Sequence, residues 1–321
     1  MGAMRTFSSV LEMVGDTPLV ELRTLSPKAG VRLFAKLEGQ NPTGSIKDRI
    51  VLRILQAARG DGRLRPGQPI VEASTGNTGV ALALFGRLMG HPVEVCVPES
   101  VYPEIEQLLR VYGAAIRRVP RRAGIKSARE VARAVATETG AYYFGQFDDP
   151  ENVRTHYETT AAEILKDLES EGGVQAFVAG MGTGGTISGA GRRLKEAGPD
   201  CHVFGVEPRL GVHVQGLHSL EDGFIPPVLD ESVLDGKIIV GNRHAFSHAR
   251  RAMLAEGIFG GISSGAVLHA GIRLAGRMER GNIVLIFADG GWKYLGTDLW
   301  REDEGKDQDT AEDPLDDILW W

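Results

Sequence analysis

The chain is poor in cysteine and has no long hydrophobic run. Its two cysteines, Cys96 and Cys201, cannot form the disulfide framework that holds small secreted domains together. No apolar stretch approaches the roughly 20 residues that a membrane-spanning helix needs, and no secretory signal is apparent at the N-terminus. From these absences we expect a globular protein with a cytoplasmic location and no membrane partner.

The chain also has no large excess of charge outside its last 20 residues. The formal net charge is −6, but residues 302–321 carry nine acids and one lysine, so residues 1–301 are net +2. We expect no nucleic-acid partner. Residues 302–313 are polar, acidic and without apolar periodicity, which predicts a flexible linker. The chain then ends in the apolar residues Ile318 to Trp321.

Short runs rich in Val and Ile alternate with helical patterns along the chain. Strands are predicted at 69–73, 92–97, 114–119, 174–179, 202–206 and 282–288. Helices are predicted at 46–59, 78–89, 103–112, 126–138, 155–169, 187–197, 243–255 and 265–278. This alternation predicts an α/β architecture with mostly parallel sheets, and 321 residues are enough for two subdomains.

The first stretch that points to chemistry is Asn41–Arg49, with the sequence NPTGSIKDR. Asn, Pro and Gly favour a turn, and Ser45 followed three residues later by Asp48 predicts the start of a helix. Lys47 then falls in the first helical turn, where the helix dipole disfavours an ammonium group. A lysine with a lowered pKa is a better nucleophile and base. Taken alone, the pattern favours a solvated surface lysine.

Two further turns lie between a strand and a helix. Residues 180–185, with the sequence GMGTGG, follow a predicted strand and match the dinucleotide fingerprint, with Glu207 at the place of a ribose-binding acid. The same glycine-rich turn would bind a single phosphate equally well. Residues 74–79, with the sequence STGNTG, form a second such turn, which is either a cradle for a carboxylate or an ordinary loop.

Together, these motifs resemble those of the fold-type II pyridoxal-phosphate enzymes, the cysteine synthase and cystathionine β-synthase group. The matching motifs are Asn41–Arg49, residues 74–79, residues 182–186 and residues 261–265, and the resemblance runs from about Gly15 to Leu295. It implies a tryptophan synthase β-like fold of two three-layer α/β/α domains with the cofactor in the cleft between them. Residues 40–148 would form a small mobile domain, 1–39 with 149–300 the large domain, and 301–321 an acidic tail.

The resemblance also assigns cofactor-binding residues. Lys47 would hold pyridoxal 5′-phosphate as a Schiff base and act as the general base. Asn77 would reach the ring hydroxyl and Ser263 the ring nitrogen. The phosphate would lie on the loop formed by Gly182, Thr183, Gly184, Gly185 and Thr186. A neutral serine at the nitrogen makes the ring a weaker electron sink, which suits elimination from the β-carbon and disfavours transamination. No metal is expected.

The residues that the resemblance implies for binding the substrate carboxylate lie in the loop 74–79 and at Gln146. The carboxylate of the amino acid would be bound by Ser74, Thr75, Asn77, Thr78 and Gln146. In the synthases the order is usually threonine then serine, whereas here Ser74 precedes Thr75. Both orders offer a hydroxyl, so the expected role is unchanged.

The reaction implied is β-replacement on an O-activated L-serine by a sulfur nucleophile, through an aminoacrylate, to give L-cysteine. Residues 256–263 and 289–295 look most like the B-type synthases, closest to the actinobacterial O-phosphoserine-dependent kind, which take sulfur from a small carrier protein with a C-terminal thiocarboxylate. The phosphate-binding arginine of that kind falls at His218 here. Those enzymes end in a similar Leu-Trp tail, so we expect Ile318 to Trp321 to dock over the cleft. A homodimer is expected.

Other reactions use the same residues with a different second substrate. Cystathionine β-synthase activity, β-cyanoalanine formation and diaminopropionate synthesis remain open, and threonine synthase or dehydratase is a remoter alternative. A nicotinamide-dependent oxidoreductase, suggested by residues 180–185 alone, would leave the Lys47 motif without a role.

Overall fold

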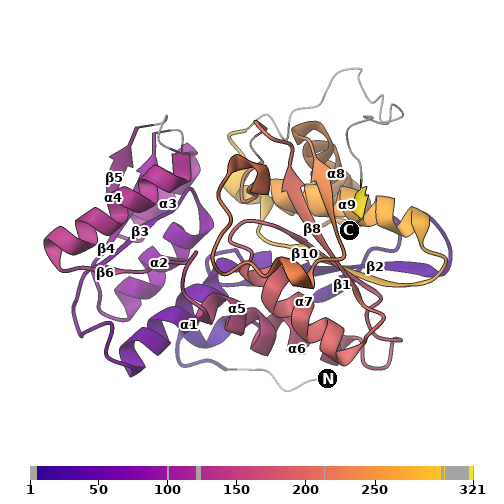
Figure 1. Ribbon diagram of the computed structural model, residues 1–321, viewed down its shortest axis with the longest axis horizontal. Coiled ribbons are helices and arrows are strands. Elements are labelled where there is room, and N and C mark those ends of the chain that lie inside the picture. Colours follow the sequence, from indigo (N-terminus) through magenta and orange to yellow (C-terminus); the bar gives the residue numbers. More distant parts are fainter. Residues whose placement is uncertain are drawn as a thin grey trace.

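The computed structural model describes residues 6–99, 101–120, 124–212, 214–297, 300 and 318–320. It contains two parallel or mainly parallel sheets, each covered by helices, which lie side by side in Figure 1. The predicted α/β class is confirmed. Within the described residues, no helix is both long enough and apolar enough to cross a membrane.

The smaller sheet lies within the segment predicted to form the small domain. Its strand order is β5-β4-β3-β6 and all its pairs are parallel. The strands are β3 (Ile70–Ala73), β4 (Val93–Pro98), β5 (Ala115–Val119) and β6 (Tyr142–Tyr143), and the helices near it are α1 (Lys47–Gly60), α2 (Asn77–Leu88), α3 (Pro103–Val111) and α4 (Gly124–Thr139). The apolar faces of α1 and α2 pack together with strands β3 and β4 in one core cluster.

The larger sheet has the order β1-β2-β10-β7-β8-β9-β11. Its strands are β1 (Leu19–Glu21), β2 (Val31–Leu37), β7 (Ala176–Gly180), β8 (His202–Pro208), β9 (Gly236–Val240), β10 (Gly281–Phe287) and β11 (Ile318–Trp320). Helices α5 (Glu151–Thr155), α6 (Ala161–Asp167), α7 (Gly185–Ala197), α8 (Asn242–Glu256) and α9 (Ile262–Arg277) belong to this part. Figure 1 shows α6 and α7 on one side of the sheet and α8 and α9 on the other.

The order of elements along the chain places the loops 74–79 and 180–185 at the carboxyl ends of parallel strands. The loop after β3 leads into α2, and the loop after β7 leads into α7. Ligands of open α/β sheets bind at this edge. The alternation of elements therefore brings the two loops to the edges where ligands are expected, although they are about 100 residues apart in the sequence.

Both cysteines are buried structural thiols in the core. Cys96 lies on β4, Cys201 precedes β8, and neither forms a disulfide. Burial raises the pKa of the Cys96 thiol to about 11 and that of Cys201 to about 12. At neutral pH both stay protonated, and the thiol is a poor nucleophile in this form.

The last described residues do not lie where the sequence resemblance placed them. Ile318–Trp320 form strand β11, which pairs antiparallel with β9 at the edge of the large sheet, Leu319 opposite Lys237. The prediction that this segment docks over the cleft is therefore wrong for Ile318–Trp320, and Trp321 lies outside the described residues. An apolar strand can satisfy the unpaired backbone groups of an edge strand, and β9 offers the free edge. The predicted linker 302–313 lies outside the described residues.

Candidate functional site

One cavity brings together three of the four sequence motifs. It opens between α1 and the loops of the larger sheet. Its lining residues are Ile46, Lys47, Gly180, Gly182, Thr183, Gly184, Thr186, Gly216, Leu217, Ser263, Val267, Ile286 and Ala288. Lys47, the glycine loop and Ser263 thus face one space, as the resemblance implied.

The turn before α1 fixes the direction of Lys47. Gly44 has φ +78°, and a Cβ there would lie 2.7 Å from the Trp292 ring, so both its backbone and its surroundings require glycine. Asp48 reaches back to accept hydrogen bonds from the backbone amide of Thr43, at 2.6 Å, and from its hydroxyl. The predicted helix start is confirmed at Lys47. The N-cap residue is Ile46, which makes no side-chain cap bond, and the Ser45 hydroxyl accepts from the Lys47 amide at 3.3 Å.

Burial gives Lys47 an amine suited to chemistry. It lowers the pKa of Lys47 to about 8, and the nearby charge of Asp289 opposes the shift without cancelling it. A larger share of the amine is therefore neutral at physiological pH than in a surface lysine. A neutral amine can act as a nucleophile and accept a proton.

The glycine loop leaves room for an anion at the start of α7. Gly184 has φ +87° and precedes the first residue of the helix, Gly185. A Cβ on Gly185 would lie 1.9 Å from Oδ1 of Asn152, and one on Gly182 would lie 2.8 Å from the carbonyl oxygen of Gly216. The amides at the start of this 13-residue helix favour an anion. The loop fits a phosphate group.

His156 supports this loop and was not found from the sequence. It is buried, with its Nε2 3.2 Å from the hydroxyl of Thr186 and its Nδ1 2.9 Å from the hydroxyl of Thr160. Burial, with the charges of Lys47 and Arg49, holds the pKa of His156 well below its usual range. The ring is neutral, so one nitrogen donates and the other accepts. It begins a π-helical turn (His156–Thr160), a feature frequent at functional sites.

The predicted substrate residues form a connected loop. Thr78 donates from its hydroxyl to Oε1 of Gln146 at 2.6 Å. The hydroxyl of Ser74 accepts from the backbone amides of Gly76 and Gly79. The backbone carbonyl of Thr75 accepts from the Gln215 side chain at 2.9 Å.

Asn152 links this substrate loop to the phosphate loop. Its Nδ2 donates to the Gln146 carbonyl at 2.8 Å and to the Thr183 hydroxyl at 3.1 Å. The two loops that would bind substrate and cofactor are therefore held together by a side chain that sequence patterns do not single out.

Asn77 is oriented by two residues far away in the sequence. Its Nδ2 donates to Oδ2 of Asp289 at 2.7 Å, and its Oδ1 accepts from Nζ of Lys293 at 2.6 Å. The Tyr294 hydroxyl also donates to Asp289, at 2.5 Å. The side chains of Asp289, Lys293 and Tyr294 are all buried. This network fixes the Asn77 amide, and Oδ1 of Asp289 is left buried without a hydrogen-bond partner.

Replacing Lys293 with methionine should weaken cofactor binding. Burial lowers the pKa of Lys293, against the charges of Asp289 and Asp48, and its amine is the group that fixes the Asn77 amide. Loss of a hydrogen bond to a charged group typically costs about 1.5–3 kcal/mol, which corresponds to about tenfold or more in the dissociation constant of pyridoxal phosphate.

The matched control is Lys195→Met. Lys195 pairs with Asp235 at 2.7 Å, and both side chains are 29% exposed. We expect the cofactor dissociation constant, measured by absorbance titration, to stay at the wild-type value in this variant. Equal cofactor affinities of the two variants would show that Lys293 does not orient the cofactor-binding loop.

Ser263 lies in the first turn of α9 and offers a neutral group to the cavity. It is buried, and it faces Gly216, where a Cβ would lie 3.8 Å from the Ser263 hydroxyl. Together with the lysine and the phosphate loop, this hydroxyl provides the set of groups that pyridoxal phosphate needs. The residues that line the cavity therefore fit that cofactor.

His218 lies beside the cavity and is held by its own turn. Its Nε2 is 2.9 Å from the carbonyl oxygen of Phe224, and its Nδ1 is 3.6 Å from a carboxylate oxygen of Asp222. Its neighbours Gly216 and Leu217 line the cavity, whereas His218 is not among the lining residues. The negative charge of Asp222 would repel a phosphate group at this position.

The dinucleotide interpretation of residues 180–185 loses its ribose-binding acid. Glu207 is buried, 3.0 Å from Nζ of Lys237, and accepts from the Leu220 amide at 2.9 Å. These contacts occupy its carboxylate inside the large domain. Glu207 is thus a structural residue.

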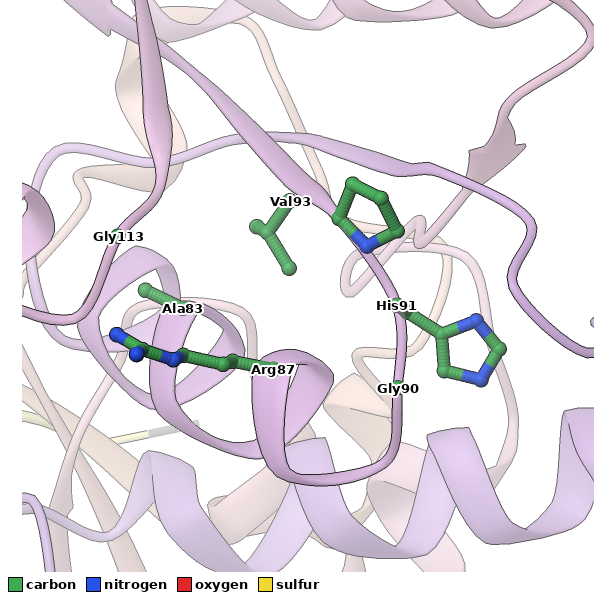
Figure 2. A pocket seen from close by; sticks show the side chains of 7 residues that line it. Ala83, Arg87, Gly90, His91, Val93 and Gly113 are labelled. Atoms are coloured by element: carbon green, nitrogen blue, oxygen red, sulfur yellow. The ribbon is translucent and has the colours of Figure 1, made fainter.

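A second hollow lies beside the smaller sheet, at the end of α2. Figure 2 shows Arg87 lying along the helix end and the His91 ring turned away from Val93. Arg87 contacts the Tyr112 carbonyl oxygen at 3.5 Å and His91 the Gln68 carbonyl oxygen at 3.0 Å. Neither motif loop reaches this hollow, so it carries none of the chemistry described above.

Comparisons with known proteins agree with this geometry. The profile of the family described as pyridoxal-phosphate dependent enzyme matches residues 10–289. A cysteine synthase of Staphylococcus aureus is 36% identical over 310 residues, covering 94% of this chain and all of that protein. A probable cysteine synthase of Bacillus subtilis is 39% identical, covering 92% of this chain and 99% of that protein.

Solved structures of similar enzymes superpose on nearly the whole chain. An O-ureido-L-serine synthase superposes with a TM-score of 0.88 and 34% identity, covering 96% of this chain and 98% of that one. A cysteine synthase of Entamoeba histolytica superposes with a TM-score of 0.87 and 34% identity, covering 95% and 94%.

Proposed function

The chain belongs to the family of pyridoxal-phosphate-dependent enzymes, and we propose that it is a cysteine synthase acting by β-replacement on an O-activated L-serine. The observation that carries this proposal is the shared cavity of Lys47, the glycine loop 182–186 and Ser263. The cysteine synthases of Staphylococcus aureus and Entamoeba histolytica, similar over nearly the whole chain, support it.

Contacts among the lining residues support the cofactor-binding roles that we propose. The bound cofactor would supply an electron-withdrawing ring that makes the α-proton of an attached amino acid acidic. Lys47 would hold it covalently, and the start of α7 would hold its phosphate, with Thr186 oriented by His156. Ser263 would contact the ring nitrogen without protonating it. Asn77, fixed by Lys293 and Asp289, would face the ring hydroxyl.

Substrate roles fall to the loop after β3. Backbone amides and hydroxyls of residues 74–78 would bind the carboxylate of the amino acid, and Gln146 would close over it through its contact with Thr78. Once its amine is released, Lys47 would take the α-proton, and the lowered pKa favours this role. Departure of acetate or phosphate from the β-carbon would leave a site for the sulfur nucleophile.

Cysteine formation from O-acetylserine and from O-phosphoserine, each with sulfide, tests this proposal. We expect turnover with at least one donor, and the ratio of kcat/KM values identifies the leaving group. A thiocarboxylated carrier protein replacing sulfide would test the second sulfur source. Failure with both donors, together with product from another nucleophile, would favour cystathionine, diaminopropionate or O-ureido-L-serine synthesis, the last being the reaction named for a structural neighbour. A homodimer and a cytoplasmic location remain proposals.

Replacing His218 with arginine should improve the use of O-phosphoserine relative to O-acetylserine. A guanidinium group is a stronger phosphate partner than a neutral imidazole, and the gain of one such bond predicts about a tenfold change in the ratio of kcat/KM values. Asp222, close to this position, would compete for the arginine. The double variant His218→Arg/Asp222→Asn removes this competition and should show the larger change. An unchanged ratio in both variants would place His218 outside the leaving-group pocket.

A further inference from the structure

Three histidines converge between α8 and α9, and no step of the proposed reaction uses them. His244 and His248 are four residues apart on α8, so they share one face of that helix. His269 lies on α9, six residues after Ser263. One ligand nitrogen from each ring lies within 4.8 Å of those from the other two. His248 and His269 are buried, and His244 is partly exposed.

The three rings lie against one another. The His244 and His269 rings are stacked with centroids 4.3 Å apart, and the His248 ring stands edge-on to His269 at 4.7 Å. Nδ1 of His248 is 3.0 Å from the backbone carbonyl oxygen of His244. A carbonyl can only accept, so Nδ1 of His248 is the donor in this contact, and the Ser247 hydroxyl lies 3.2 Å from the same nitrogen. Metal-binding histidines characteristically make this second hydrogen bond.

Arg273 lies close enough to His269 to act on it electrostatically. Its positive charge opposes a bound cation, and the three nitrogen donors must outweigh it.

We propose that His244, His248 and His269 bind one divalent transition-metal ion of the zinc class, which ties α8 to α9. Three imidazoles with a water in the fourth position are a known zinc donor set, and zinc–nitrogen bonds of 2.0–2.1 Å need nitrogens roughly 3.3 Å apart in a tetrahedral site. Rotation of the partly exposed His244 side chain would close the present separations. The ion would fix α9, whose first turn carries Ser263, and would take no part in the reaction.

Zinc titration of the holoenzyme, freed of metal by a chelator, tests the proposal. With a chromophoric chelator as competitor, we expect one Zn²⁺ to bind with a dissociation constant of about 1 µM or tighter. His244→Gln, at the most exposed of the three positions, should weaken it by about 100-fold, since even an outer-shell partner typically contributes 10- to 100-fold. His202→Gln is the control, because His202 has a 61% exposed side chain on β8 and should leave zinc binding unchanged.

Two further measurements make the result independent of misfolding and of activity. Cobalt(II) added in place of zinc should give visible absorption bands of a tetrahedral site in the wild-type protein and in His202→Gln, and none in His244→Gln. Far-ultraviolet circular dichroism should show that all three proteins are folded. Wild-type zinc affinity weaker than about 100 µM, or equal affinity in wild-type protein and folded His244→Gln, would overturn the proposal.

Discussion

Lys47→Ala is expected to reduce kcat for cysteine formation by about 10⁴-fold or more while leaving the fold intact. The amine would both hold the cofactor and move the α-proton, and a well-placed general base alone contributes 10²- to 10⁴-fold. The side chain lines the cavity and takes part in no ion pair among the described residues. Steady-state kinetics with saturating pyridoxal phosphate measures the loss, and circular dichroism checks the fold.

The control for this variant is Lys166→Ala. Lys166 is an exposed lysine on α6, outside the cavity. We expect wild-type kcat and wild-type cofactor content. If Lys47→Ala keeps more than about a tenth of the activity of Lys166→Ala, Lys47 is not the reacting amine.

Arg49→Met is expected to lower the free energy of unfolding by about 3–5 kcal/mol, the range typical of breaking a buried ion-pair network. Arg49 binds Glu38 at 2.7 and 2.8 Å and Glu163 at 2.6 and 2.7 Å, with its side chain 2% exposed. Glu38 directly follows β2, and Glu163 lies on α6. The network joins the first turn of α1, and with it Lys47, to β2 of the larger sheet and to α6.

Arg53→Met, one turn further along α1, is the matched control. Arg53 pairs with Glu151 and Glu158, but its side chain is 32% exposed, and pairs of this kind contribute about 1 kcal/mol or less. Chemical denaturation of both variants measures the difference. Equal loss of stability in the two would contradict a structural role specific to Arg49.

The same network predicts sensitivity to acid. Burial raises the pKa of Glu163, but the bonds and charge of Arg49, with Lys36, outweigh it and hold the pKa at about 2. Because the folded pKa lies below its ordinary value of 4.5, the stabilisation is present above pH 4.5 and is lost as pH falls towards 2. In Arg49→Met this carboxyl loses its main partner, so less stability remains to be lost over that range.

The elements that the sequence predicted well are those with local signals. The helix starting near Lys47 and the strand–loop–helix around 182–186 were found because turn residues, caps and apolar periodicity lie within a few positions of each other. Strands β1, β2, β6, β9 and β11 were missed. Leu19–Glu21 has only three residues, and both β2 and β9 contain lysines, Lys36 and Lys237, whose charges are paired inside the fold.

The supporting residues of the site could not be predicted from such patterns. Asn77 and Lys293 are 216 positions apart, and His156 and Thr186 are 30 apart, so only the folded chain shows that they touch. The predicted docking of the terminal segment over the cleft was wrong for a related reason. An apolar terminal segment predicts docking, but it does not specify which surface receives it, and in the structure it is the edge of β9.

Lys47 is the residue that would carry pyridoxal phosphate in the proposed enzyme. Borohydride reduction of the holoenzyme, followed by proteolysis and mass spectrometry, locates the covalently fixed cofactor directly. We predict a phosphopyridoxyl group on the peptide containing Lys47 and on no other peptide. The group on the buried Lys293 or Lys36, or no covalent attachment in a protein that retains the cofactor, would contradict this assignment.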